Sequence, residues 1–186
     1  MRLDMPIVET SRLYLRPLEV EDACDLFEVY KDPRVTQYLT MKPHVSVDET
    51  LAMLQAGMLP YLKRGVPQTW VMELKESERV IGDLGIHTIE EDIGQIGYVL
   101  HPDYWGQGYM KEALTELVHV GFDHVGLRRI EALYEVEHQA SGYVLKACGF
   151  VEEGRLRQYA MLQDGKYHDM ILMSILKNEG RRDKDE

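Results

Sequence analysis

Between residues 98 and 110 the chain reads Tyr-Val-Leu-His-Pro-Asp-Tyr-Trp-Gly-Gln-Gly-Tyr-Met, and this stretch decides how the rest is organised. Its pattern predicts an apolar strand that enters a loop carrying Gly106 and Gly108, followed by a helix. Backbone N–H groups at a helix N-terminus have no partner inside the helix, and the peptide dipoles add a partial positive charge there. Glycines let the loop turn tightly and let a ligand come close to the backbone. The stretch therefore predicts an anion site, most plausibly for a phosphate group.

Two better-known phosphate motifs are excluded by the same residues. A dinucleotide fingerprint needs a third glycine where Lys111 stands, and a P-loop needs a Gly-Lys-Ser/Thr ending that is absent. For the two glycines alone, a plain loop turn without a ligand is the alternative interpretation.

Several separated segments carry a resemblance to a known family. They are Thr10–Leu18 (TSRLYLRPL), Gly97-Tyr98, Tyr104–Tyr109 (YWGQGY), Ala140-Ser141 and Lys146–Phe150 (KACGF). In order and spacing they resemble the GNAT superfamily of N-acetyltransferases, and within it the ribosomal-protein N-terminal acetyltransferase branch. The resemblance covers roughly residues 7–176.

Hydrophobic periodicity and turn residues predict alternating strands and helices. Strands are expected at Leu13–Leu18 (an edge strand), Trp70–Leu74, Val80–Ile89, Gln95–Leu100, Arg129–Val136, and twice after Phe150 around an Asp164-Gly165 turn. Helices are expected at Glu21–Tyr30, from Ser46 to Leu62 with a stop at Gly65 and Pro67, from Met110 to a stop at Gly126, and at Ala140–Ala147. Gly82 and Gly85 are predicted to mark a bulge in their strand.

This alternation predicts a single α/β or α+β domain. The resemblance narrows it to the acyl-CoA N-acyltransferase fold, a mixed and mostly antiparallel sheet with splayed central strands flanked by helices. The domain is expected over residues 7–176, and the charged residues 177–186 are expected to be a disordered tail.

The composition limits the classes of partner. A formal net charge of −11 argues against a nucleic-acid partner and favours a cationic one, although acidity can also serve solubility alone. We find neither a membrane-length apolar run nor a signal peptide, so a cytoplasmic protein is expected. Cys24 and Cys148 are too few for a disulfide framework. His119 and His124 are five residues apart, which does not place two ligands on one helix face, so no metal site is expected.

The resemblance implies acetyl-CoA as the cosubstrate. Backbone N–H groups of Gly106, Gln107, Gly108, Tyr109 and Met110 would bind its pyrophosphate. Main-chain groups of Val99 and Leu100 would pair with pantetheine, and an N–H from about Leu100 would stabilise the thioester oxygen as it gains charge.

At four positions the chain departs from the family pattern. Trp105 stands where Arg or Gln is usual, and Met110 stands where Gly or Ala is usual, with a long side chain that either crowds the phosphates or turns away. His138 replaces an asparagine that binds pantetheine, so that contact would depend on pH. Leu145 replaces the tyrosine that protonates the leaving thiolate, and Ser141, one helical turn earlier, is our candidate for that role, with helix capping as its alternative.

The general base is left open among several residues. Glu137 is the principal candidate, beside Glu135 at the same strand end, with Glu73 and His87 acting through water as further candidates. A base is not obligatory, because an amine can arrive partly neutral.

The resemblance thus implies an N-acetyltransferase that uses direct attack in a ternary complex. Its acceptor would be a primary amine, either a peptide N-terminus or a small molecule. A non-catalytic acyl-CoA sensor is the alternative, because several usual catalytic positions are changed. Members of the branch are often homodimers, and the apolar run Met170–Met173 is expected to supply a paired edge.

Overall fold

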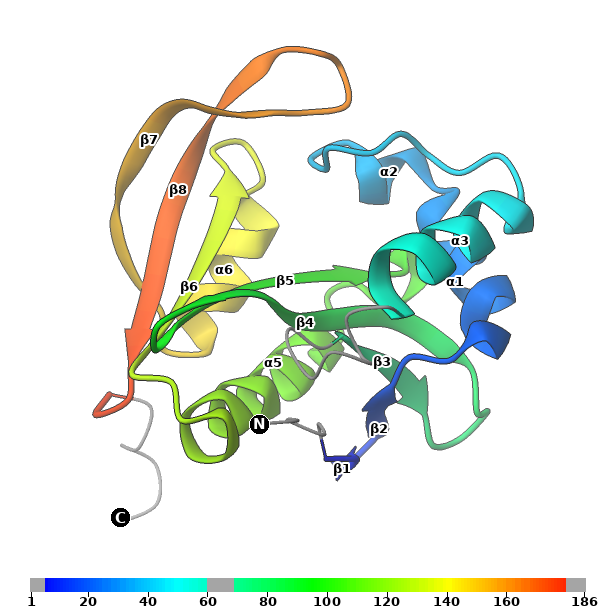
Figure 1. The fold of residues 1–186 in the computed structure, drawn as a ribbon, viewed down its shortest axis with the longest axis horizontal. Coiled ribbons are helices and arrows are strands. Elements are labelled where there is room, and N and C mark those ends of the chain that lie inside the picture. The colour runs from blue at the N-terminus through cyan, green and yellow to red at the C-terminus, as the bar shows by residue number, and fades with distance from the viewer. Residues whose placement is uncertain (1–5, 60–68, 180–186) are drawn as a thin grey trace.

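The computed structural model describes residues 6–59 and 69–179, and in these residues eight strands form one sheet in the order β1-β2-β3-β4-β5-β6-β8-β7 (Figure 1). The strands are β1 (Val8–Glu9), β2 (Leu13–Pro17), β3 (Thr69–Leu74), β4 (Val80–Glu90), β5 (Ile93–Leu100), β6 (Arg129–Glu135), β7 (Val151–Met161) and β8 (Tyr167–Leu176). Only the β5–β6 pair is parallel among these described strands. The predicted mixed, mostly antiparallel sheet is confirmed.

Helices cover both faces of this sheet. They are α1 (Ala23–Tyr30), α2 (Pro33–Thr36), α3 (Val47–Met53), α5 (Tyr109–Val120) and α6 (Gln139–Ala147), with π-helical turns at Leu54–Met58 and Gly121–Val125 and 3₁₀ turns at Val20–Asp22 and Pro102–Tyr104. As predicted, the helical segment that begins with α5 ends at Gly126, which adopts φ +86°.

The core has two parts because side chains alternate along each strand. On β3, buried Trp70 and Met72 belong to the cluster that includes Leu114 of α5, whereas Val71 belongs to the cluster that includes Leu26 of α1. The sheet therefore lies between α5 and α6 on one face and α1 to α3 on the other.

The parallel pair β5–β6 splays apart, as the resemblance implied. Its register runs only from Ile93 opposite Arg129 to Ile96 opposite Ala132. Beyond Ile96, β5 keeps its partner β4 as far as Leu100, while β6 continues beside β8. In Figure 1 the strands β6, β8 and β7 accordingly turn away from the rest of the sheet.

The helix predicted from Ser46 to Leu62 is only partly described. Ser46 Oγ accepts from the Glu49 N–H at 3.3 Å, but the Glu49 carboxylate accepts from the Val45 N–H at 2.7 Å, so the reciprocal capping box is not formed. The α-helix gives way to a π-helical turn at Leu54. Leu62 and the predicted stop at Gly65 and Pro67 lie outside the described residues.

The bulge prediction is right at Gly82 and wrong at Gly85. The β3–β4 register shifts between Val71 and Glu73, opposite a stretch that contains Gly82. A Cβ at Gly82 would lie 2.3 Å from the Val99 carbonyl oxygen, so glycine permits this close backbone approach. Gly85 instead pairs regularly, and the second irregularity of β4 falls between Ile86 and Thr88, where His87 is the extra residue.

Two edge predictions are wrong. The strand at Leu13 is not an edge, because the two-residue β1 pairs with it. The run Met170–Met173 is not an edge either, since β8 pairs with β6 on one side and β7 on the other. The edge at this end of the sheet is β7, which carries the exposed side chains of Tyr159 and Met161.

The C-terminal hairpin turns where it was predicted. Gly165 adopts φ +75°, and the Leu162 N–H donates to the Lys166 carbonyl at 3.1 Å. After β8, the Lys177 ammonium donates to the Phe122 carbonyl at 2.7 Å. Residues 180–186 of the predicted tail lie outside the described residues. Within the described residues we find no helix long and apolar enough to cross a membrane.

Candidate active site

The loop between β5 and α5 has the geometry of an anion site. Gly106 and Gly108 adopt φ +72° and +81°, a left-handed conformation that disfavours side chains. Gly108 is the N-cap residue of the twelve-residue helix α5. The first N–H groups of α5 and the positive end of its dipole therefore face the loop.

Arg12, from the N-terminal segment, contacts this loop. Arg12 donates from Nη1 to the Gln107 carbonyl at 2.9 Å, and its guanidinium lies 3.9 Å from the centre of the Tyr109 ring. Glu112, in the first turn of α5, accepts from Arg12 Nε at 2.7 Å. The sequence analysis used the Thr10–Leu18 segment for its resemblance but gave Arg12 no role.

Four donors converge on the Glu112 carboxylate. Besides Arg12 Nε, they are the Arg12 N–H at 2.9 Å, the Thr10 hydroxyl at 2.6 Å and the Ser11 hydroxyl at 2.8 Å. Burial alone would raise the pKa of Glu112, but these hydrogen bonds outweigh it and lower the pKa to about 2. We call residues Thr10, Ser11, Arg12 and Glu112 the loop clasp.

The two unusual side chains of the loop have separate environments. Trp105 donates from Nε1 to the Leu100 carbonyl at 2.8 Å, which ties the loop to the end of β5. Met110 is 5% exposed and packs into the core. Of the two outcomes expected for Met110, the side chain turns inward rather than over the loop.

A cavity of about 600 Å³ opens where β5 and β6 separate, and we call it the loop-side cavity. Of the predicted carrier-binding residues and the principal catalytic candidates, all but Gln107 line it: Val99, Leu100, Gly106, Gly108, Tyr109, Met110, Glu137, His138 and Ser141. The side chain of Gln107 instead donates to the Asp103 carbonyl at 2.7 Å.

Ser141 lies in a hydroxyl pair that the sequence analysis missed. Its Oγ is 2.7 Å from the Tyr98 hydroxyl, and either oxygen can be the donor. Burial raises the pKa of Tyr98 well above its usual value, so this phenol keeps its proton at neutral pH. The N-cap residue of α6 is His138 rather than Ser141, so the capping alternative for Ser141 is wrong. The Gly97-Tyr98 pair was part of the resemblance and was the available signal.

The carboxylates considered for the general base lie in different places. The Glu135 carboxylate accepts from the Glu137 N–H at 2.6 Å and lies 3.4 Å from His168 Nδ1, while Glu137 itself is exposed at the cavity rim. Glu73 pairs with Arg16 at 2.6 Å and lines neither described cavity.

His138 stacks on a ring from the other side of the loop-side cavity. Its ring centroid lies 4.5 Å from that of Tyr38, and the two planes are tilted by 21°. Burial lowers the pKa of His138, which keeps the imidazole neutral at pH 7.

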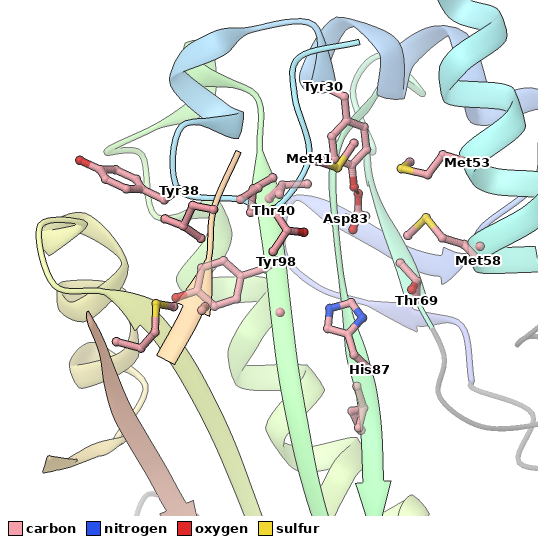
Figure 2. Close-up of a pocket in the computed structure, with 18 residues that line it drawn as sticks. Tyr30, Tyr38, Thr40, Met41, Met53, Met58, Thr69, Asp83, His87 and Tyr98 are labelled. Atoms are coloured by element: carbon pink, nitrogen blue, oxygen red, sulfur yellow. Dashed lines mark hydrogen bonds between the residues drawn. The ribbon is translucent and has the colours of Figure 1, made fainter. Parts of the chain in front are cut away.

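A second cavity of about 500 Å³ adjoins the first on the α1–α3 side of the sheet. Figure 2 shows Met41, Met53 and Met58 around it, with Asp83 below Tyr30 and His87 further along β4. We call it the methionine cavity. Both cavities are lined by Tyr38, Leu39, Gly97, Tyr98, Val99 and Met170, so they meet at the splay.

Two ionisable side chains, Asp83 and His87, line the methionine cavity. Asp83 is 3% exposed, and its Oδ2 accepts from the Tyr30 hydroxyl at 2.6 Å. Burial raises the pKa of Asp83 to about 7. The His87 ring packs over Gly97, where a Cβ would lie 2.5 Å from Nε2, and desolvation lowers the pKa of His87. No group of three or more possible metal ligands occurs in the described part of the chain.

Comparisons with known proteins identify the family. Residues 12–151 match the model of the acetyltransferase (GNAT) domain. The uncharacterized N-acetyltransferase YoaA of Bacillus subtilis is 34% identical over 92% of this chain and 97% of its own length. The ribosomal-protein-serine acetyltransferase of Escherichia coli is 31% identical over 68% of this chain and 70% of its own length.

The fold of a solved enzyme agrees. The crystal structure of spermidine N-acetyltransferase from Vibrio cholerae in complex with CoA and spermine superposes with a TM-score of 0.78 at 23% identity, covering 91% of this chain and 98% of that one. The chain therefore belongs to the GNAT family and is an acetyl-CoA-dependent N-acetyltransferase.

Proposed function

We propose that this enzyme transfers an acetyl group from acetyl-CoA directly to a primary amine, with the carrier in the loop-side cavity and the amine in the methionine cavity. The observation that supports this arrangement most strongly is the meeting of the two cavities at Gly97, Tyr98 and Val99. Direct attack requires both substrates to reach one point from opposite sides, and holding them there removes most of the entropic cost of their encounter.

The residues of the loop fit the carrier. Two left-handed glycines and the N-terminus of α5 suit a pyrophosphate, and Arg34 and Lys111 bring positive charge to the same cavity. Because β5 has no β6 partner beyond Ile96, the main chain of Val99 and Leu100 remains our candidate for pairing with the extended pantetheine, with the Leu100 carbonyl already accepting from Trp105 Nε1 at 2.8 Å. Acetyl-CoA would supply the activated thioester. The Leu100 N–H would then stabilise the developing oxyanion.

The hydroxyls of Tyr98 and Ser141 and the carboxylate of Glu137 are our candidates for the proton transfers of the reaction. We assign protonation of the leaving thiolate to the Tyr98–Ser141 pair. Both hydroxyls remain protonated at neutral pH and can act as one proton relay. Glu137, at the rim, remains our candidate for accepting the ammonium proton, and His138 remains our candidate for the pantetheine contact. The sensor alternative was motivated by the loss of the usual tyrosine at the position of Leu145 in α6, and Tyr98 offers a hydroxyl from strand β5 instead.

The carrier site is tested with Gly108→Val. A Cβ at Gly108 would meet only Arg12 Nη2, at 3.6 Å, so the main cost is the left-handed backbone and the obstruction of the loop. We expect CoA to bind at least tenfold more weakly by calorimetry, which is about 1.4 kcal/mol.

Gly126→Val is the matched control, because Gly126 has φ +86° with open space around it at the far end of the same helical segment. It should lose similar stability and keep its CoA affinity. Equal CoA affinity in folded Gly108→Val and unaltered enzyme would refute the proposed carrier site. A thiol-release assay with a panel of amines tests turnover, and CoA binding without release on any amine would favour the sensor.

A further inference from the structure

The Asp83 carboxyl occupies a place where a carboxyl group is costly. It is buried at 3% exposure, and taking a carboxylate out of water costs free energy unless partners compensate. It accepts a hydrogen bond from a neutral group, the Tyr30 hydroxyl. Other acids of the fold, such as Glu112 and Glu153, are held by arginines.

No lysine or arginine lines the methionine cavity among the described residues. Asp83 therefore lines the cavity without a lysine or arginine beside it among the residues that the structure describes. Such a site attracts a positively charged group, since a charge-assisted hydrogen bond is about twice as strong as a neutral one. The raised pKa of Asp83, about 7, is the expected signature of a carboxyl that lacks this cation.

Much of the remaining lining is apolar, although the polar side chains of Thr40, Thr69, His87 and Tyr98 also reach the cavity. Met53 and Met58 lie on one side of the cavity and Met41 lies beside Tyr30, and the aliphatic side chains of Leu39, Ile86 and Leu162 also line it. Thioethers accept hydrogen bonds only weakly, whereas each residue of a bound peptide brings an N–H and a carbonyl that need partners. A volume of about 500 Å³ is in the range of small-molecule sites.

Asp83 is also close to the junction of the two cavities. It pairs with Val99 across β4 and β5, and paired residues of antiparallel strands have Cα atoms about 4.5–5.5 Å apart. Val99 lines both cavities. A cation held by Asp83 is therefore one strand away from the place where the acetyl group would arrive.

We infer that the acceptor is a small hydrophobic amine, an alkyl or arylalkyl ammonium whose charge is held by Asp83 and whose carbon chain lies among Met41, Met53 and Met58. This inference rests on the proposed function and narrows its acceptor from any primary amine to this class. It disfavours a peptide N-terminus.

Binding is tested first, because it does not depend on turnover. With CoA present at saturation, hexylamine and 1-hexanol are titrated into the enzyme by calorimetry; the two probes differ in charge at one end. We expect hexylamine to bind at least tenfold more tightly than 1-hexanol. Equal affinity of the two probes in the unaltered enzyme would overturn the inference without any variant.

Substitution then assigns the effect to the acid. Asp83→Asn should abolish the preference for hexylamine and leave CoA affinity unchanged, and Tyr30→Phe, which keeps the carboxyl, should retain most of it. Glu76→Gln removes one exposed charge in the β3–β4 turn and serves as the matched control. Asp83→Asn with a normal melting curve and unaltered hexylamine affinity would contradict the inference.

Turnover separates this inference from the proposed function. Thiol release is followed with hexylamine, phenethylamine and an alanine-initiated peptide. Release with the peptide but neither amine would overturn the acceptor class and leave acetyl transfer intact. Binding of hexylamine through Asp83 with no release on any acceptor would instead refute the proposed function.

Discussion

Replacing Glu112 by glutamine tests the loop clasp, which joins the N-terminal segment to the first turn of α5. The carboxylate accepts hydrogen bonds from Thr10, Ser11 and both the backbone and side chain of Arg12, at 2.6–2.9 Å. Glutamine keeps one acceptor oxygen but replaces the other with an amide NH2 group, itself a donor, that faces these donors. We expect the variant to fold with lower stability.

The magnitude follows from the pKa. It is lowered from 4.5 to about 2 in the folded protein, a difference of about 2.5, which corresponds to about 3.4 kcal/mol. Because the side chain is 16% exposed and its arginine partner 40%, solvent screening reduces this to about 1–2 kcal/mol. A lowered pKa means that the contribution is present above about pH 4.5 and is lost as the pH falls through 4.5 toward 2.

Urea unfolding at pH 7 and pH 3 measures this contribution. The unaltered protein should lose stability between the two values, and Glu112→Gln should be about 1–2 kcal/mol less stable at pH 7 and lose less on acidification. Glu116→Gln, one turn further along α5 and 3.8 Å from His119, is the matched control and should behave like the unaltered protein. Parallel pH profiles for Glu112→Gln and the unaltered protein would refute the role assigned to this carboxylate.

Two further predictions concern turnover and assembly. Ser141→Ala and Tyr98→Phe should each lower kcat and kcat/KM together by roughly 10–100-fold with CoA affinity retained. If the two hydroxyls act as one relay, the double variant falls no further than the worse single variant, and additive losses in single-turnover rates would contradict the relay. For assembly, the resemblance predicts a homodimer, so light scattering should give twice the 21.6 kDa chain mass. We expect pairing through the exposed β7 edge, so Met161→Lys should return the mass to 21.6 kDa. A monomer mass for the unaltered chain at micromolar concentration would argue against the dimer.

The parts of the fold that the sequence predicted are those determined by local chemistry. The glycine loop before α5, the left-handed stop at Gly126 and the Asp164-Gly165 turn each depend on a few neighbouring residues. Within α5, Met110, Ala113, Leu114 and Leu117 are buried at helical spacing, and this periodicity was visible beforehand. The splay of β5 and β6, by contrast, came from the resemblance, because no local pattern specifies where two parallel strands part.

What could not be predicted depends on contacts between distant residues. Tyr98 and Ser141 are 43 residues apart, Tyr30 and Asp83 are 53 apart, and Arg12 and Glu112 are 100 apart. Each of these residues has an ordinary local context. The wrong edge at Met170–Met173 has the same origin, since an apolar run predicts a buried strand but does not say which neighbours cover its two sides.

The irregularities of β4 and β5 connect these distant contacts to the chemistry. The bulge beside Gly82 occurs one residue before Asp83, which lies on the α1–α3 face beside Val99, and the irregularity at His87 lets its ring fold over Gly97. His87 lies next to the point where β6 leaves β5 at Ile96, and Gly82 lies further along, opposite Leu100. Continued pairing of β5 with β6 beyond Ile96 would close the junction of the two cavities. The proposed catalytic arrangement therefore depends on the point where β5 and β6 stop pairing, and the residues with the greatest effect on the acceptor are expected along β4, one strand away from the carrier.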